Sequence, residues 1–576
     1  DYIADTKSPN DYPSSSEKRC YWEEQVFENV LSFNKEIKKH SINAILGTSM
    51  ASRKYNWSSV GVEGKTIVYS IEDGKLQQTE KPAGFLDSSF ATINAGAGGT
   101  YSGSGTRWNY NRASFFGRLN YNYNNRYLVQ FTFREDGSSK FGSDSRWGFF
   151  PSVVVGWRIS EEPFFPQNSV ISNLKFRASW GQLGNENALG YYDFLALIST
   201  YNDLYQGYVQ GTGSSAWPGS IARTLENRSL KWETTDTKNI GFDFGLFNNH
   251  LNGNINYYIN ETRDLLITRK IAPSAGLADP TLNVGKMRNQ GFEMELNWNS
   301  KVSDFEYNVG FNISTVNNKV VSLADEDQTI YGMGLKYGSE HFPTQTKVGK
   351  PIGAFYLYQA DGIFQSMDEV NAHKNSKGEL LQPNAKPGDI RFKDMDGNGV
   401  IDEGDKVYSG TGIAKVEANL NLSASYKGLD FSAVIGSAFG NKIYNGNQYY
   451  YEGMNSAHNF LSTTLNAWTP TNTNTKVPRA IYGDPNDNTR ESTRFLENGD
   501  FVRLRQIQVG YTLPKAWVKQ VYCDRIRFYV SAENLFTITG YSGANPEFSM
   551  GVLNSGIDRF TYPFSRSYTV GAQVTF

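Results

Sequence analysis

Long apolar runs, cysteines and an excess of either charge are all scarce in this sequence. No run approaches the ~20 apolar residues that a membrane-spanning helix needs, and the mean hydropathy is -0.51. The two cysteines, Cys20 and Cys523, are too few for a disulfide framework or a zinc site. Lys and Arg total 56 against 58 Asp and Glu, so the basic excess of a nucleic-acid-binding protein is missing.

Motifs for catalysis are also missing, and the sequence therefore predicts a protein that is not an enzyme. None of the five histidines forms a His-Glu-x-x-His pair, and there is no Gly-x-Ser-x-Gly elbow. The glycine-rich stretch 96–105 lacks the Lys-Ser/Thr ending of a phosphate-binding loop. Neighbouring carboxylates such as Glu293 and Glu295 resemble the paired acids of a hydrolase. On the polar face of a strand that lines a water-filled pore, however, they are more simply pore-lining charges.

The sequence is rich in aromatic residues and glycine, and its apolar and polar residues alternate. It contains 35 Tyr, 36 Phe, 11 Trp and 55 Gly. Apolar residues largely occupy every second position in 251–260, 292–299 and 416–426. This period of two indicates β-strands with one apolar and one polar face. A barrel with lipid outside and water inside has such strands, although a soluble sandwich shares the alternation.

The lengths of the strands and of their connections favour the barrel. The predicted strands, about fifteen in number and about ten residues long, are 21–33, 38–47, 110–123, 126–133, 148–160, 172–182, 236–247, 251–261, 289–299, 304–316, 414–426, 429–439, 500–511, 525–533 and 566–576. Short turns, such as 34–36 and 427–428, alternate with long segments at 48–109, 183–235, 262–288, 317–413 and 440–499. Short turns at one end and long loops at the other are typical of outer-membrane barrels. The sequence thus predicts an all-β fold, a large antiparallel transmembrane β-barrel.

The odd strand number predicts that residues 1–576 are the C-terminal part of a larger barrel. Single-chain bacterial barrels have an even number of strands, with their short turns in the periplasm. If the last strand ends there, residues 1–20 lie outside the cell. The last strand carries Tyr568 and the final residue, Phe576, on one face. This arrangement resembles the terminal aromatic signal that the barrel-assembly machinery reads.

Several segments resemble the SusC/RagA family of outer-membrane importers. Residues 108–165 contain RASFFGR, DGSSKFG and WGFFPS in the order found in that family. The next matches are LKFRASWGQLGNEN at 174–187, LKWETTDTKNIGFDFGLFNN at 230–249 and VGKMRNQGFEMEL at 284–296. The series ends with FLENGDFVRLRQIQVGYTLP at 495–514, SAENLFTITGYSGANPEF at 531–548 and YPFSRSYTVGAQVTF at 562–576.

The resemblance implies a barrel of 22 strands, an N-terminal plug, energy supplied through TonB and a SusD-like surface lipoprotein as partner. We expect the plug and the TonB-contacting segment to lie outside this chain, because residues 1–47 are predicted as a loop and a hairpin. The expected function is active import of an oligomeric nutrient, a glycan fragment, across the bacterial outer membrane. A peptide importer of the same family, a passive porin and a surface adhesin are the alternatives. A plug upstream would separate an importer from the last two.

The acidic segment 394–405 follows the pattern of a calcium-binding loop. Its oxygen ligands would be Asp394, Asp396, Asn398, the carbonyl of Val400, Asp402 and Asp405. The segment differs from an EF-hand because its last ligand is Asp rather than Glu and no helices flank it. The alternative is a turn whose acidic side chains bind their own backbone. Carboxylates so close repel one another unless a cation lies among them, so we expect a structural Ca²⁺ and no organic cofactor.

Aromatic residues in two of the long segments are the candidate substrate contacts. Tyr205, Tyr208 and Trp217 lie in 183–235, and Tyr449 and Tyr450 lie in 440–499. Flat rings can stack on sugar rings or pack against peptide side chains. The alternative for each residue is that it closes the core of its own loop or contacts the capping partner.

Overall fold

One antiparallel sheet, with its strands paired in chain order, dominates the computed structural model. The structure describes residues 14–72, 75–83, 92–96, 98–166, 170–201, 208–209, 216–217, 219–222, 224–269, 274, 276–335, 341–453 and 459–576. The strands of the sheet are β1 (Ser14–Ile37), β2 (His40–Glu63), β5 (Thr100–Tyr123), β6 (Tyr127–Ser138), β7 (Trp147–Arg158), β8 (Ile171–Asn185), β13 (Glu233–Leu246), β14 (Leu251–Arg263), β17 (Lys286–Val302), β18 (Phe305–Thr315), β26 (Val416–Tyr426), β27 (Leu429–Phe439), β30 (Phe501–Thr512), β31 (Arg525–Thr539) and β33 (Ser567–Thr575), and β19 (Asn317–Ser322) pairs with β17. All the predicted strands are present, which confirms the all-β prediction.

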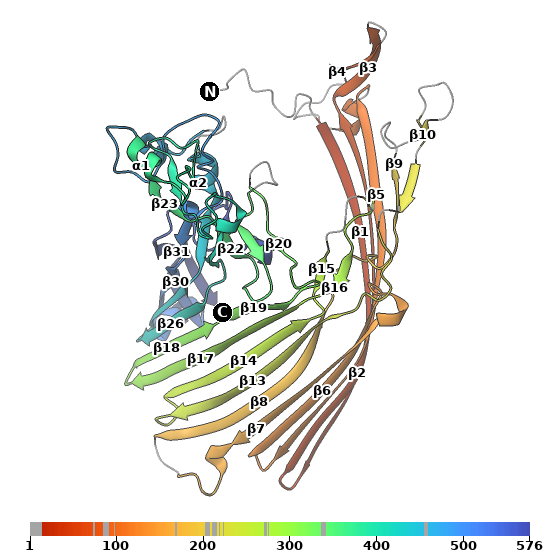
Figure 1. Cartoon of the computed structure of the whole chain (residues 1–576). Coiled ribbons are helices and arrows are strands. Elements are labelled where there is room, and N and C mark those ends of the chain that lie inside the picture. The colour runs from red at the N-terminus through yellow and green to blue at the C-terminus, as the bar shows by residue number, and fades with distance from the viewer. Residues whose placement is uncertain are drawn as a thin grey trace.

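The sheet curves around an open interior, with its strands tilted and its hairpin turns at the lower edge in Figure 1. β1 is at one end of the strand order and β33 at the other, and within the described residues these two strands do not pair. The longer connections lie at the upper edge of the sheet (Figure 1). This is the predicted asymmetry between the two ends of the strands.

The two faces of the sheet differ in polarity because the strand register keeps residues of one kind side by side. On the outer face Phe311 lies opposite Leu296 of β17 and Leu420 of β26. On the inner face the neighbouring Asn312 lies opposite Asn419. Many large apolar side chains on the outer face are exposed, because no other part of the described protein covers them. This face suits contact with lipid, and the inner face suits contact with water.

β1, β2 and β5 are longer than the sequence predicts. Each has 24 residues, so the predicted loop 48–109 is strand up to Glu63 and again from Thr100. The prediction was wrong there because the alternation of apolar and polar residues ends where the strands pass beyond the membrane. Where the strands are no longer in contact with lipid, their outer face need not be apolar. The backbone pairing of β2 with β5 continues there although the alternation has ended.

The hairpin turns are tight and rely on left-handed backbone conformations. Lys427 has φ of 46° and Gly428 has φ of 90°, the pair of positive angles that a type I′ two-residue turn requires. The first hairpin turns at Lys38 and Lys39, with φ of 54° at Lys38. The turn predicted at 34–36 was therefore wrong: residues 34–36 instead continue β1 in register with β2.

Above the sheet, at the end of the strands where outer-membrane barrels have their long extracellular loops, three connections fold together into what we call the extracellular module: the described residues of 330–411, 440–498 and 541–558. Its elements are β20 (Ile330–Tyr331), β21 (Thr344–Thr346), β22 (Ala354–Leu357), β23 (Ala360–Ile363), α1 (Met367–Ala372), β24 (Ile390–Phe392), β25 (Val407–Thr411), β28 (Lys442–Asn445), α2 (Gly446–Tyr451), β29 (Leu496–Asn498) and β32 (Ile557–Asp558). Phe355, Leu357, Tyr444 and Phe495 form one core with Ile557. A module with its own core holds a defined shape at the barrel mouth.

The remaining elements are short. Those on the outer connections are β3 (Lys65–Glu72), β4 (Lys75–Pro82), β9 (Ile198–Tyr201), β10 (Tyr208–Val209), β11 (Ala216–Trp217), β12 (Gly219–Ala222), β15 (Leu266–Thr268) and β16 (Thr281–Asn283), and the helix α3 (Lys515–Val518) follows β30. No helix in the described part of the chain is long and apolar enough to cross a membrane.

Candidate functional site

The inner face of the sheet is a polar wall on which many charged and amide groups pair across strands. Arg177 of β8 donates to Asp243 of β13 at 2.8 Å. Further along the sheet, Asn419 of β26 donates to Asn312 of β18 at 2.9 Å. Paired charges and amides make a polar surface without a large field of one sign. Such a wall suits the passage of a hydrophilic solute.

Four aromatic side chains form a cluster on this inner face, here called the aromatic row: Trp22, Tyr55, Trp108 and Tyr191. Trp22 of β1 is the register partner of Tyr55 of β2, and Tyr55 is the partner of Trp108 of β5. The ring centroids are 5.9 Å apart for Trp22 and Tyr55 and 5.0 Å apart for Tyr55 and Trp108. Trp108 stacks on Tyr191 with a centroid distance of 4.1 Å and an interplanar angle of 18°.

Trp22, Tyr55 and Trp108 lie on the part of β1, β2 and β5 that extends beyond the membrane, and Tyr191 lies in the connection between β8 and β13. Trp22 has the same orientation as Glu24, whose carboxylate accepts a hydrogen bond from Arg53 Nε at 2.7 Å on the inner face. In Figure 1 these tall strands stand on one side of the mouth and the extracellular module stands on the other. The row therefore faces the space through which a solute would enter.

Polar contacts stabilise the end of the aromatic row that contains Tyr191. The Tyr110 hydroxyl donates to Glu186 Oε1 at 2.5 Å, and Lys140 Nζ donates to the Glu186 carbonyl at 3.2 Å. The same Lys140 ammonium lies 5.4 Å from the centroid of the Tyr191 ring, close enough for a cation–π contact. These contacts fix the segment that carries Tyr191, so its ring is positioned against Trp108 before any ligand binds.

The row offers flat apolar surface next to hydrogen-bonding groups. Trp22 is 59% exposed, and the Glu24–Arg53 pair lies one inner-face position away along the strands. Rings supply apolar area for the face of a sugar ring, and the charged pair supplies partners for hydroxyl groups. The row was missed in the sequence because residues 48–109 were assigned to a loop. The spacing of Tyr55, Trp57 and Trp108 could have signalled strand faces there.

The substrate contacts predicted from sequence have different surroundings. Tyr449 is 4% exposed within the module core, and its hydroxyl lies 3.1 Å from His341 Nδ1. Tyr450 packs against the same core and donates to the Leu335 carbonyl at 2.6 Å. These contacts match the alternative role of closing a loop core, while substrate binding by the two tyrosines stays a prediction.

The other three predicted contacts are in the connection between β8 and β13. Tyr208 and Trp217 are backbone partners in the short ladder of β10 and β11. Tyr205 lies outside the described residues. Substrate binding by all three stays a prediction.

The acidic loop brings three of its six predicted ligands together. Carboxylate oxygens of Asp394, Asp396 and Asp405 all lie within 4.8 Å of one another, and Asp405 is fully buried. Asn398 Nδ2 lies 3.2 Å from Asp402 Oδ2 in the same loop. Oxygen donors of this kind suit Ca²⁺.

Backbone amides also bind the acidic side chains of this loop. Asp405 accepts from the N–H groups of Met395 and Asp402 at 2.6 and 2.8 Å, and Asp394 accepts from Gly397 and Gly399 at 2.7 and 2.9 Å. This is the self-bonded turn of the alternative interpretation. A carboxylate oxygen has a second lone pair, so these contacts are compatible with a cation, and the calcium site, including the Val400 carbonyl, stays a prediction.

The predicted assembly signal is on the outer face of the last strand. Tyr568 and Val570 are opposite Ala532 and Val530 of β31, and Tyr568 is 69% exposed toward the lipid side. Phe576 directly follows β33 and is also exposed. The geometry agrees with a terminal strand that presents aromatic residues outward, and recognition by the assembly machinery stays a prediction.

A sheet of this size, with one lipid-facing and one polar face, defines the class of outer-membrane β-barrels. The chain belongs to the TonB dependent receptor-like, beta-barrel family, whose model matches residues 47–535. This family is located in the bacterial outer membrane, and it consists of receptors and transporters rather than enzymes. Family membership thus confirms the predicted location and the predicted lack of enzymatic activity.

The chain is similar in sequence to TonB-dependent receptors of two bacteria. The chain is 33% identical over 473 residues to TonB-dependent receptor SusC of Bacteroides thetaiotaomicron, covering 80% of this chain and 43% of that protein. It is 29% identical over 561 residues to TonB-dependent receptor P3 of Formosa agariphila, covering 95% of this chain and 52% of that protein. The chain thus spans about half the length of the curated relatives it matches.

A solved structure of the RagAB peptide transporter shows the same fold. The TM-score is 0.77 with 24% sequence identity, and the match covers 98% of this chain and 56% of that chain. The RagAB importer in its open-open state matches with a TM-score of 0.78 and 23% identity. At this identity the likeness concerns the fold alone.

Proposed function

We propose that the protein imports an oligomeric nutrient, a glycan fragment, actively across the bacterial outer membrane. The observation that carries the proposal is the aromatic row, Trp22, Tyr55, Trp108 and Tyr191, on the inner face of the barrel mouth. A row that crosses three neighbouring strands presents an extended surface rather than a single pocket. An oligomer with repeated flat rings can use such a surface along its length, whereas a small ion cannot.

The inner wall continues the route from the aromatic row toward the periplasmic turns. Below the row, amides replace aromatic rings on the same strands, for example where Asn120 of β5 donates to Asn43 of β2 at 3.1 Å. A hydroxyl-rich solute can exchange its hydrogen bonds with water for bonds to such groups at little net change in free energy. Binding is therefore strongest at the mouth and weaker along the wall, so the energy of active transport must drive the solute inward from the row.

The proposed transport needs two partners, a SusD-like lipoprotein and TonB. The resemblance to SusC/RagA proteins and the relative named SusC support both, and the family description includes TonB dependence. The extracellular module offers the lipoprotein a preformed surface, because its cores are packed within the module itself.

A peptide is the second candidate for the substrate. The fold of the RagAB peptide transporter matches this chain, and ion pairs on the inner wall, such as Arg177 with Asp243, could bind peptide charges. Sugars are favoured here because the exposed ring of Trp22 and its neighbours are uncharged flat surfaces at the point of entry.

Uptake measurements with defined substrates test the proposal. Cells producing the protein are given labelled oligosaccharides or peptides of matched length, and Trp22→Ala with Trp108→Ala is compared with Trp517→Ala. Trp517 is the matched control because it is exposed on α3 at the turn end of the sheet. We expect oligosaccharide uptake at limiting concentration to fall at least tenfold only in the double variant. Uptake of peptides alone, or equal uptake by both variants, would overturn the proposal.

A further inference from the structure

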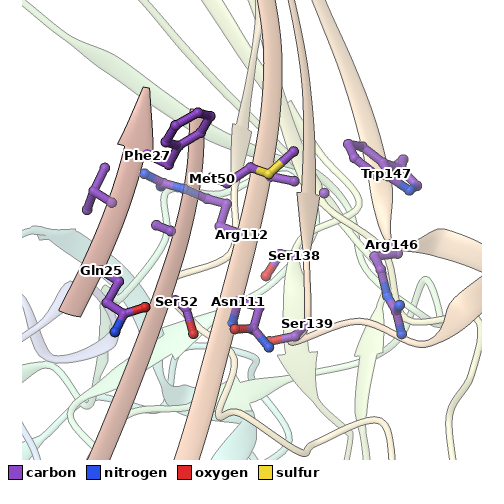
Figure 2. A pocket seen from close by; sticks show the side chains of 14 residues that line it. Gln25, Phe27, Met50, Ser52, Asn111, Arg112, Ser138, Ser139, Arg146 and Trp147 are labelled. Carbon is purple, nitrogen blue, oxygen red and sulfur yellow. The ribbon is translucent and has the colours of Figure 1, made fainter. Parts of the chain in front are cut away.

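The outer face of the sheet contains a groove of about 870 Å³ at the upper edge of its apolar surface. Phe27 of β1 and Met50 of β2 form one side of it, and Trp147 of β7 forms the other. Between them the residues are small, because Ala113 of β5 is the register partner of Met50 and Gly137 of β6 is the partner of Ala113. Figure 2 shows Phe27 and Met50 on one side and Trp147 on the other.

Trp147 is positioned by the glycine beside it. A Cβ atom on Gly137 would lie 2.8 Å from the Trp147 ring, so the absence of a side chain there lets the ring lie against the strand. The same ring stacks on Phe115 with a centroid distance of 6.0 Å. Trp147 nevertheless remains 47% exposed. The groove therefore has a rigid aromatic side that is open toward the membrane.

The groove becomes polar at its end away from the hairpin turns. Gln25, Ser52 and Asn111 are register partners across β1, β2 and β5, and Ser139 continues the row beyond β6 (Figure 2). Arg146 also lines this end. In the part of the chain that the structure describes, its guanidinium has no hydrogen-bond or ion-pair partner, although its carbonyl accepts from Ser138 and Trp232.

The depth of the change from apolar to polar matches the edge of a membrane. From Phe27 to Ile37, where β1 ends at the turn, there are eleven residues, and a tilted strand spans the hydrocarbon layer with about 9–11 residues. Phe27 and Met50 thus lie at the outer limit of the acyl chains. Gln25, Asn111 and Arg146 lie at the level of the lipid headgroups on the extracellular side.

The charges near the polar end favour an anionic headgroup. Lys54 and Arg107 are exposed on the same outer face farther from the turns, and among the described residues neither has an ion-pair partner. Glu23 is the register partner of Lys54, but its carboxylate accepts hydrogen bonds from Tyr21 and Gln25. Glu135 lies on the opposite side of Gly137, within the apolar zone.

We propose that this groove binds one phosphorylated lipid of the outer leaflet, with an acyl chain between Phe27, Met50 and Trp147 and a phosphate at Arg146. Arginine suits this role because its planar guanidinium pairs with two phosphate oxygens at once. Gln25, Asn111 and Ser139 supply further hydrogen bonds to the sugar or phosphate oxygens. The lipid would fasten the tall strands β1, β2 and β5 to the membrane surface, whichever nutrient the barrel imports.

Native mass spectrometry of the protein extracted gently from its outer membrane tests this site. After removal of bound lipid, the probes are phosphorylated lipid A, dephosphorylated lipid A and phosphatidylglycerol. Arg146→Gln should weaken binding of phosphorylated lipid A about fivefold, because one cation near the surface contributes roughly 1 kcal/mol to binding an anionic lipid. Ala113→Phe, which fills the groove on a lipid-facing surface without altering a packed core, should reduce binding more than tenfold.

Arg288→Gln is the matched control. Arg288 is on the outer face of β17 beyond the apolar zone, like Arg146, but its guanidinium is bound to Glu261. We expect wild-type lipid binding in this variant and weaker binding of both other probes to the wild-type protein. Equal binding of dephosphorylated lipid A or of phosphatidylglycerol, or equal losses in the Arg146 and Arg288 variants, would overturn the proposal.

Discussion

Removing the carboxylate of Asp389 should open the extracellular module locally. This side chain is 0% exposed and accepts hydrogen bonds from Arg479 Nε at 2.7 Å, Arg479 Nη2 at 3.0 Å and Asn488 Nδ2 at 3.0 Å. It also accepts from the Lys386 backbone N–H at 2.8 Å. The carboxylate thus ties two distant connections of the module together. Asp389→Ala would leave the Arg479 guanidinium mostly buried without its partner.

The expected loss of stability is about 3–5 kcal/mol, the usual cost of breaking a buried ion pair from one side. Because each ~1.4 kcal/mol changes an equilibrium tenfold, local opening should increase by a factor of about 10² to 4 × 10³. Hydrogen exchange monitored by mass spectrometry over residues 382–392 measures this directly. Ile390 is a suitable reporter, since its N–H donates to Asn488 Oδ1 at 2.8 Å.

Asp361→Ala is the control in the same module. Asp361 pairs with Arg391 at 3.2 Å and Lys393 at 3.3 Å but is 42% exposed, and exposed pairs contribute only about 0–1 kcal/mol. Exchange in 382–392 should therefore change at most about fivefold. If Asp389→Ala also stayed within about fivefold of the wild type, the module would not depend on this buried pair and the reasoning would be refuted.

Three further predictions concern the calcium loop, the partner and the inner wall. Asp394→Ala with Asp396→Ala should abolish binding of one Ca²⁺ in calorimetric titration and speed proteolysis of 317–413; unchanged proteolysis on chelation would count against the site. Gentle extraction should recover the protein in complex with a SusD-like lipoprotein, with an interface that buries well over ~2,000 Å² in total. Native mass spectrometry that finds the barrel without the lipoprotein would contradict this. Gly47→Val should impair barrel assembly, because a Cβ atom at Gly47 would meet the Phe116 ring; normal heat-modifiable protein on gels would refute the close packing.

The strands of the sheet could be predicted from sequence because lipid on one side and water on the other impose a strict alternation. Leu420 and Leu422 face outward while Asn419 and Asn421 face inward, and a membrane barrel repeats this pattern along every strand. The outer parts of β1, β2 and β5 could not be predicted in this way. With water on both faces there, the alternation disappears while the backbone pairing remains.

The candidate site was harder to predict than the fold because it depends on which strands are neighbours. Trp22, Tyr55 and Trp108 are far apart in sequence, and only the register of β1, β2 and β5 brings their rings together. Tyr449 and Tyr450 are predicted from sequence as substrate contacts in a long loop, and in the structure they pack in or against a core whose other members, such as Phe355 and Ile557, come from distant connections. Sequence pattern shows the faces of one strand but not the packing of long loops.

Direct binding of an oligosaccharide to the purified protein tests the central claim, that the aromatic row receives the nutrient. Calorimetric titration would compare the wild type with Trp108→Ala, which removes the ring between Tyr55 and Tyr191, and with Trp517→Ala. Loss of one stacking ring should weaken binding about tenfold, or ~1.4 kcal/mol, and the Trp517 variant should bind as the wild type does. Unchanged affinity in Trp108→Ala for a glycan that the wild type binds would contradict the account.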